Sequence, residues 1–220
     1  RIIPATTKVF ITAKYGSFTK IVNSGLPDDS KFDYTYFATN LQWVPGHSNS
    51  WHRDVYGEFG PINNKVISED RVIPFRASLL GSVISFTRPL VKRRINDSSI
   101  MYKIKSCNIF TNKKWFEDRL IFIHNNYIAI LKNYLQDISL IETGKGSQNS
   151  HYSNLKNIIQ IKKAYYELRL AYEQGLLSLY EYFYTARAQG VAFLGVILSI
   201  FEDRFPKLFY LLSHTKLVIL

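Results

Sequence analysis

The chain has 220 residues, of which 46% are hydrophobic and 15% aromatic, too many core-forming side chains for a disordered protein. Lysine and arginine number 28 against 17 acidic residues, and the resulting net charge of +11 favours polyanionic partners such as RNA, DNA or an acidic membrane surface. The single cysteine, Cys107, excludes an intrachain disulfide and a multi-cysteine zinc site, and we expect a packing role for it in a reducing compartment or mitochondrial matrix.

The amino-terminal segment is basic throughout. Residues 1–27 contain four basic residues and no acidic one: Arg1, Lys8, Lys14 and Lys20. This pattern resembles the end of an organellar transit peptide or a basic arm. An ordinary pair of positively charged strands explains it equally well, so both interpretations stay open.

Residues 1–110 are predicted to form strands and turns. Alternating or β-branched runs lie at residues 8–14, 17–22, 32–44, 72–79 and 100–110. Clusters of glycine, proline, serine, asparagine and aspartate separate them at residues 24–29, 45–50 and 60–64. These signals indicate a small, mostly antiparallel β region.

From Lys113 the apolar residues recur with a helical period. The first stripe comprises Phe116, Leu120, Ile123, Tyr127, Leu131, Tyr134 and Ile138. A polar turn follows at residues 143–150, and Ser153 or Asn154 can cap a second helix. Its stripe is broken only at Gly175 and comprises Ile158, Ile161, Tyr165, Leu168, Tyr172, Leu176, Leu179 and Phe183. Two such helices joined by a short loop are expected to pair antiparallel.

A third helix is predicted over residues 191–201, an apolar run that is too short to cross a bilayer, which needs about 20 residues. We expect a buried helix followed by a docked tail, with insertion into a membrane surface or a partner as the alternative. The segment Lys216–Leu220 could add as an edge strand to another chain. The predicted partner-binding residues are therefore Leu217, Val218, Ile219 and Leu220.

Together these elements predict an α+β fold. A β-rich, basic amino-terminal lobe (residues 1–110) packs on a carboxy-terminal helical lobe (residues 111–220), formed by the antiparallel helical hairpin and the third apolar helix. The two lobes form either separate units or one continuous domain.

The densest positive segment is predicted to bind nucleic acid. Its basic residues, set against the single Asp97, are Arg88, Lys92, Arg93, Arg94, Lys103, Lys105, Lys113 and Lys114. Aromatic residues flank them, and aromatic faces beside cations suit stacking on unpaired bases and neutralising phosphates. In the alternative interpretation the aromatic residues face the core and the cations are simply solvated. Arg93 and Arg94 cannot share one side of a strand, so at least one reaches outward.

Residues 51–54 (WHRD) contain the letters of a protein-kinase catalytic loop. The position at which that loop needs a metal-binding asparagine is Phe59, and neither an Asp-Phe-Gly motif nor a glycine-rich loop is present, so a kinase is excluded. His47, His52 and Asp54 lack a third histidine or a paired acid at ligand spacing. A hydrogen-bonded loop is expected there instead of a metal site.

The segments 15–18 (YGSF) and 26–29 (LPDD) distantly resemble the entry motif of the nucleotidyltransferase and poly(A) polymerase families. In those families a Gly-Ser pair cradles phosphate and two alternating carboxylates hold magnesium. Here the carboxylates are adjacent (Asp28 and Asp29) or four residues apart (Asp29 and Asp33), so they do not share a strand face. The plain alternative is a Gly-Ser hairpin followed by an aspartate-capped turn.

The sequence therefore favours a non-catalytic structural subunit of a large assembly, with no catalytic residue, metal site or cofactor. The leading hypothesis is an RNA-binding component of an organellar ribonucleoprotein resembling a mitochondrial ribosome, located in the mitochondrion with other protein subunits. The alternative is a protein-interaction or membrane-associated subunit of an organellar complex or virion, without a transmembrane helix and located in the cytoplasm or the virion. A divergent nucleotidyltransferase is the third hypothesis.

Overall fold

A computed structural model of the chain describes residues 9–17, 20–22, 31–46, 49–92, 113–144 and 152–191. Contacts divide the chain into two compact units, which we call unit 1 (Arg1–Asp97 and Ala129–Gln160) and unit 2 (Ser98–Ile128 and Ile161–Leu220). Helices predominate over strands, and the combination of a small sheet with long helices is α+β-like. The boundaries of these units differ from the predicted boundary after residue 110. The division into two lobes, residues 1–110 and 111–220, stays a prediction.

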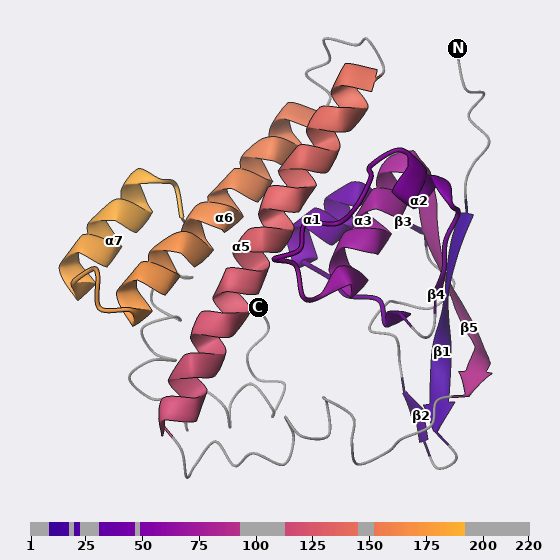
Figure 1. Cartoon of the computed structure of the whole chain (residues 1–220), viewed down its shortest axis with the longest axis horizontal. Helices are drawn as coiled ribbons and strands as arrows, with labels where there is room; N and C mark the ends of the chain where they lie inside the picture. Colours follow the sequence, from indigo (N-terminus) through magenta and orange to yellow (C-terminus); the bar gives the residue numbers. More distant parts are fainter. Residues whose placement is uncertain are drawn as a thin grey trace. The chain divides into compact units, whose positions relative to one another are not determined.

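The sheet of unit 1 is built on a parallel pair of strands, β1 (Val9–Ser17) and β5 (Ser82–Lys92). The other described strands are β2 (Lys20–Val22), β3 (Lys31–Phe32) and β4 (Asn49–Ser50), in the order β2-β1-β5-β3 with β4 also on β1. Since β5 lines one edge of β1, β2 and β4 share the other edge (Figure 1).

The prediction of a mostly antiparallel sheet holds for three of the four described pairings, but the longest pairing is parallel. Parallel strands need a long crossover, which the helices between β1 and β5 supply. One face of the sheet is buried, since Phe32 and Val83 are 6% and 1% exposed while Lys31, next to Phe32, is exposed.

Two segments predicted as strands are helices. The run at 32–44 forms α1 (Tyr34–Asn40), and the run at 72–79 lies in α3 (Glu69–Leu80). Asp33 caps α1, because its Oδ1 accepts a hydrogen bond of 2.9 Å from the backbone N–H of Tyr36. Capping and tertiary packing thus outweigh the strand preference of the aromatic and β-branched residues in these segments.

Pro74 connects α3 to the loop that follows α1. A proline at this position has no N–H to donate to the carbonyl of Asp70, one helical turn earlier. That carbonyl instead accepts a hydrogen bond of 2.9 Å from the backbone N–H of Val44. Gly46 also approaches this residue closely, since a Cβ atom on Gly46 would lie 2.8 Å from Asp70 Oδ1. The backbone of α3 therefore fixes the loop at residues 44–46.

Packing of α5 (Lys113–Gly144) in unit 1 centres on Tyr134. Its ring stacks on Phe75 of α3 with centroids 3.8 Å apart, and its hydroxyl donates to the carbonyl of Arg71 at 2.9 Å. Burial raises the pKa of Tyr134, so the hydroxyl keeps its proton and remains a donor. The predicted stripe is confirmed at this end of α5, where Leu131, Tyr134 and Ile138 are fully buried.

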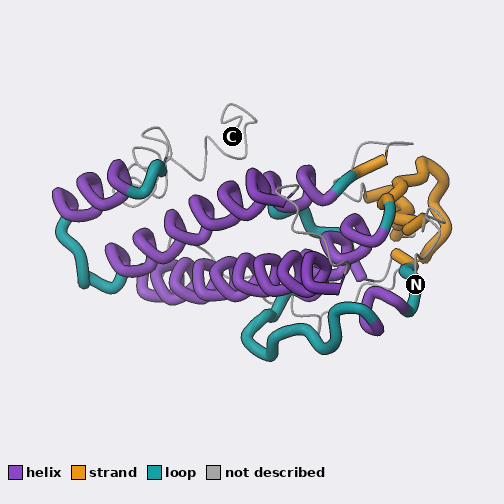
Figure 2. The backbone as a smooth tube through the Cα atoms, turned by 90° about the horizontal axis from the view of Figure 1, so that it is seen from above, coloured by secondary structure: helices purple, strands orange, loops and turns teal. Residues whose placement is uncertain are grey.

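The order of contacts between α5 and α6 (Ser153–Glu173) is that of an antiparallel hairpin (Figure 2). In unit 2 His124, early in α5, contacts Glu173 at the end of α6. In unit 1 Glu142, near the end of α5, pairs with Lys156 near the start of α6. The turn was predicted at 143–150, but its first two residues still belong to α5, and residues 145–150 lie outside the described residues.

The second predicted helix does not continue to Phe183, because the chain turns at Gly175. This glycine has a φ of +71°, its N–H donates to Tyr172 O at 3.0 Å, and the N–H of Leu176 donates to Ala171 O at 2.9 Å. These two bonds form a Schellman motif, which ends a helix through a left-handed residue.

A new helix, α7 (Leu179–Ala188), begins after this turn. Ser178 and Glu181 form a reciprocal capping box at its start. A second Schellman motif ends it at Gly190, where Val191 N donates to Ala186 O at 3.0 Å. Apart from Val191, the predicted third helix lies outside the described residues, as do the strand at 100–110 and the tail at 217–220.

None of the described helices is both long enough and apolar enough to cross a bilayer.

Replacing Gly175 tests the helix ending. We expect Gly175→Ala to lower the free energy of unfolding by about 1 kcal/mol, since a Cβ atom disfavours a positive φ and no neighbouring atom would otherwise meet it. Gly175→Asn, which tolerates the left-handed region better, should cost clearly less. Urea unfolding followed by circular dichroism measures both, and equal costs for the two variants would contradict the assignment.

Candidate functional site

The strands of unit 1 are basic. The described strands carry five basic residues and no acidic one: Lys14, Lys20, Lys31, Arg88 and Lys92. Lys31, on the edge strand β3, pairs in register with Ile84 near the start of β5. The other four lie at the opposite end of β1 and β5.

The strand register brings those four positions together. Lys92 pairs with Gly16, and Lys20 pairs with Ser17, the next residue of β1. Neighbouring strands are about 4.8 Å apart, so the backbones of Lys20 and Lys92 lie two strand spacings apart, on the order of 10 Å.

A break in the parallel register places the other two basic residues here. Ala13 pairs with Phe86, but Tyr15 pairs with Val91, so residues 87–90 of β5 stand opposite Lys14 alone. Pro89 has no N–H for the ladder, which explains why the pairing is interrupted at this point. Lys14 and Arg88 thus join Lys20 and Lys92, and we call these four residues the basic end of the sheet.

The predicted nucleic-acid segment is only partly described. Arg88 and Lys92 lie on β5, whereas Lys113 and Lys114 begin α5 and belong to unit 2. Arg93, Arg94, Lys103 and Lys105 lie outside the described residues. Lys14 and Lys20 were missed as site residues, because their proximity to β5 depends on a parallel pairing that spans some seventy residues of sequence.

Several acidic side chains of unit 1 are engaged with partners that do not belong to the sheet. Asp33 caps α1, Asp54 lies 3.1 Å from His52 Nδ1, Asp137 pairs with Arg76, and Glu142 pairs with Lys156.

A buried ion pair joins α3 to α5 in unit 1. Arg76 donates from Nε and Nη2 to the two carboxylate oxygens of Asp137 at 2.9 and 3.0 Å, and both side chains are at most 1% exposed. Asn133 Nδ2 donates to the same carboxylate at 2.7 Å, and Arg76 Nη1 donates to Gly60 O at 2.7 Å. The groups satisfy one another, as buried charges require, so this cluster is structural.

The carboxyl group of Asp137 is nevertheless costly to ionise. Burial raises its pKa to about 6, outweighing the Arg76 guanidinium and the Asn133 hydrogen bond, which both lower the pKa. The sequence reasoning missed this cluster. A second helical stripe was present on α5 as a signal, consisting of Asn126, Ile130, Asn133, Asp137 and Ile141, and all five side chains are buried.

A second buried cluster joins α5 to α6 in unit 2. Glu173 holds His124 Nδ1 at 2.8 Å with one oxygen and accepts from Arg169 Nε at 3.0 Å with the other. Arg169 Nη1 reaches the hydroxyl of Tyr165 at 3.3 Å, and the ring of Tyr166 lies against the His124 ring with centroids 5.6 Å apart. Each charged group has its partner within the cluster, which indicates a structural role here as well.

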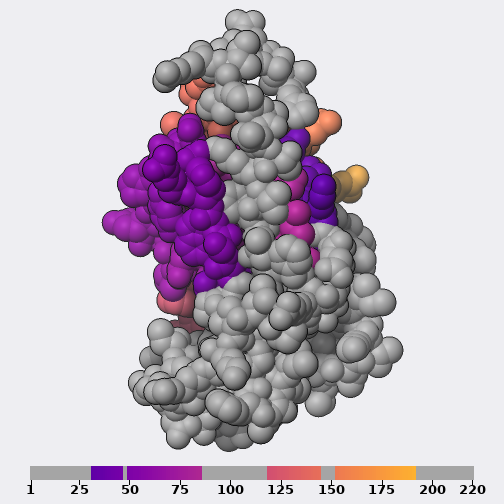
Figure 3. All heavy atoms as spheres, turned by 90° about the vertical axis from the view of Figure 1, so that its right-hand side faces the viewer, coloured from indigo at the N-terminus to yellow at the C-terminus, as the bar shows by residue number. Residues whose placement is uncertain are grey.

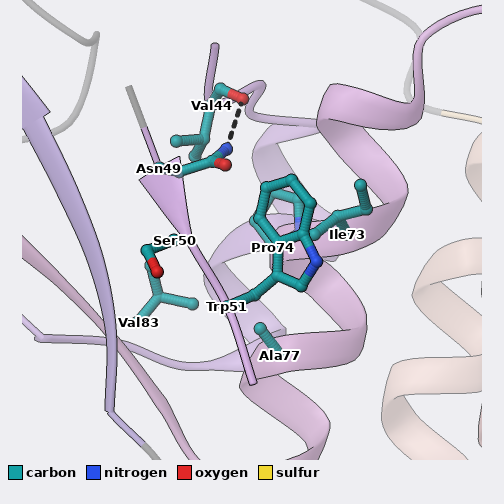
Figure 4. A pocket seen from close by; sticks show the side chains of 8 residues that line it. All are labelled: Val44, Asn49, Ser50, Trp51, Ile73, Pro74, Ala77 and Val83. Atoms are coloured by element: carbon teal, nitrogen blue, oxygen red, sulfur yellow. Dashed lines mark hydrogen bonds between the residues drawn. The ribbon is translucent and has the colours of Figure 1, made fainter. Parts of the chain in front are cut away.

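The hollow beside the sheet is small. It has a volume of about 10 Å³, room for about one water molecule, and its walls include Val44, Trp51 and Pro74. Trp51 and Pro74 both line the hollow, and the Asn49 amide donates to Val44 O at 3.1 Å (Figure 4). Small-molecule sites are usually at least 300 Å³, so this hollow does not suit a substrate.

The other motifs are resolved in part. Within the described part of the chain, no three or more His, Cys, Asp or Glu side chains gather in a metal-binding group. His52 contacts Asp54 at the first residue of α2 (Asp54–Gly57), which confirms that His52 is hydrogen-bonded. Gly16 pairs with β2 as in an ordinary hairpin, and Asp33 is occupied as a cap, while Asp28 and Asp29 lie outside the described residues.

Comparison with known proteins finds no matching family, no matching curated protein and no matching solved structure.

The raised pKa of Asp137 makes stability depend on pH. The unfolded carboxyl titrates near 3.8 and the folded one at about 6, so this group's contribution to stability falls as pH rises through that window and is constant above it. Arg76→Met removes the cation that lowers this pKa. We expect the fall to extend above pH 6, with a loss of about 3–5 kcal/mol near pH 8.

Urea unfolding between pH 5 and pH 8 measures this loss for Arg76→Met. The matched control is Arg76→Met combined with Asp137→Leu, which removes the buried charge and should abolish the extra pH dependence. A loss for Arg76→Met that is the same at every pH would contradict the assignment.

Proposed function

We propose that this protein is a non-catalytic, RNA-binding structural subunit of an organellar ribonucleoprotein such as a mitochondrial ribosome. The observation that carries the proposal is the basic end of the sheet, where the strand register places basic positions of three strands next to one another. A net charge of +11 adds a long-range attraction for polyanions. Other protein subunits of the same assembly would be its further partners.

The spacing of the basic end supports contacts with a phosphate backbone. Neighbouring strands are about 5 Å apart, so the basic positions of the sheet are close enough to contact neighbouring phosphates of one nucleic-acid strand. Several lysine and arginine residues can therefore neutralise several phosphates at once and release their counterions. The chain continues from Lys92 directly into Arg93 and Arg94, which extend the basic sequence.

A binding role is also supported by how the buried polar residues are used. The Arg76–Asp137 pair and the His124–Glu173–Arg169 cluster are satisfied internally, so their charges serve packing. Positioned but unsatisfied groups facing a sizeable cavity would favour catalysis instead. The basic end has the positive charge that recognition of RNA requires.

Charge reversal at the basic end tests the proposal. We expect Lys14→Glu with Lys92→Glu to weaken binding of single-stranded RNA by at least tenfold. The slope of log affinity against log salt should fall in magnitude by about 0.7 for each phosphate that the variant no longer neutralises. Fluorescence anisotropy over a series of salt concentrations gives both quantities.

The matched control reverses two exposed cations of the same unit, Arg53→Glu with Lys65→Glu, and changes the net charge equally. Both lie in the segment from β4 to α3, which forms a continuous area of the surface (purple in Figure 3). Equal loss of affinity in the two double variants would mean that net charge alone attracts RNA, and the proposed site would be wrong. RNA that co-purifies with the wild-type protein and depends on Lys14 and Lys92 would identify the assembly.

A further inference from the structure

Helix α7 turns an aromatic face towards solvent. Tyr180 and Tyr184, one helical turn apart, are 79% and 71% exposed, and Arg187 follows with an exposed side chain. Tyrosine and arginine are enriched among the residues that dominate protein–protein binding. This face therefore has the composition of a protein interface.

The other face of α7 holds the helix in place. Tyr182 and Ala186 are fully buried, and the Tyr182 ring stacks on Tyr172 with centroids 5.2 Å apart. The capping box at Ser178 and the turn at Gly190 fix the two ends. The exposed tyrosines are thus presented by a preorganised helix, which lowers the entropy cost of binding a partner.

The charge of this face favours protein over RNA. Its two charged side chains, Glu181 and Arg187, cancel each other, although the chain as a whole carries +11. A polyanion would gain little here, whereas a neutral surface of the same kind would meet no repulsion.

We propose that α7 pairs antiparallel with α7 of a second copy of this chain, about a twofold axis at Tyr184. With a rise of 1.5 Å per residue, Tyr180 lies about 6 Å before Tyr184 and Arg187 lies about 4.5 Å after it. Successive residues are rotated by about 100° around the helix axis. Viewed along the helix, Tyr180 and Arg187 therefore lie roughly 40° and 60° from Tyr184, both to the same side.

A twofold axis perpendicular to the plane of the two helices reverses the helix direction. Residues on one side of that plane in the first copy stay on the same side in the second copy. Tyr180 of one copy therefore meets Arg187 of the other, and symmetry forms this contact twice. A guanidinium over a tyrosine ring is an attractive arrangement, and the two Tyr184 rings meet at the axis. Ala188 faces Glu181 of the second copy and is small enough to let the helices approach.

Disulfide trapping tests the register. The sequence has one cysteine, so Tyr184→Cys and Ala188→Cys are each made with Cys107→Ser, and again with Cys107 retained in case the serine variant does not fold. Tyr184→Cys should form a linked dimer on mild oxidation, because its two copies meet at the axis. Ala188→Cys should not, because its two copies lie about 12 Å apart along the helices, and a disulfide spans at most about 7 Å between Cα atoms.

Sedimentation equilibrium gives a second readout without cysteines. The wild-type protein should show a monomer–dimer equilibrium, which Arg187→Gln weakens about tenfold and Tyr184→Glu abolishes by placing two carboxylates at the axis. Tyr56→Glu, at an exposed tyrosine of α2, is the matched control and should leave the dimer unchanged. Higher salt should favour the dimer, because it screens the repulsion between two positively charged copies, whereas salt weakens RNA binding.

Several outcomes would overturn the pairing. Equal linking of Tyr184→Cys and Ala188→Cys would indicate random collision or parallel helices. If the Tyr184→Cys variant is monomeric and its new thiol reacts freely, the exposed face of α7 would bind a different protein. If the variant is monomeric and the thiol is protected, another segment of the chain would cover this face. RNA affinity measured in the same variants separates this inference from the proposed function, and its loss in a monomeric Tyr184→Glu variant would make the face a stacking platform for bases.

Discussion

The fold of unit 1 depends on a charged side chain that a helix carries into the core. Asp137 is fully buried on α5, and a buried carboxylate is tolerated only where a cation and hydrogen-bond donors reach it. Arg76 supplies the cation and two donors, which fixes the position of α3 against this part of α5. Asn133 adds a third donor to the carboxylate and accepts a hydrogen bond from the backbone of Asn63, so the loop before α3 is fixed by the same cluster. Hydrogen bonds to a charged group are directional, so this cluster constrains the relative positions of α3, α5 and the loop before α3.

The sequence predicted the elements with a strong and long period, and it failed where a local signal competed with a tertiary one. The stripe on α5 was legible because its apolar residues recur over several turns. The strands expected at 32–44 and 72–79 are helices, because the cap at Asp33 and the packing of Phe75 decide those segments. The end of α6 was predictable from Gly175 followed by the Ser-x-x-Glu box at 178–181, but the apolar spacing runs across this turn and conceals it. Two of the four residues of the basic end, Lys14 and Lys20, could not be predicted from the sequence, because only a pairing between distant strands brings them close to β5.

Two features of contrasting chemistry emerge, one in each unit. The basic end of the sheet combines basic residues with strands that contain no acid, and the attraction of such a positive charge for polyanions acts at long range and weakens with salt. The exposed face of α7 is neutral and aromatic, and it acts only on contact. The proposed binding of RNA and the proposed pairing of two copies would therefore use different parts of the chain.

Pro74 favours the hydrogen bond that holds the loop at residues 44–46 on α3. In an ordinary helix the carbonyl of residue 70 would be occupied by the amide four residues later, and the Val44 amide would have to compete for it. Pro74 has no N–H and cannot compete, so the carbonyl of Asp70 remains available to accept from the Val44 amide. Proline usually disrupts a helix, but here the backbone acceptor that it leaves free holds the loop at residues 44–46 against α3.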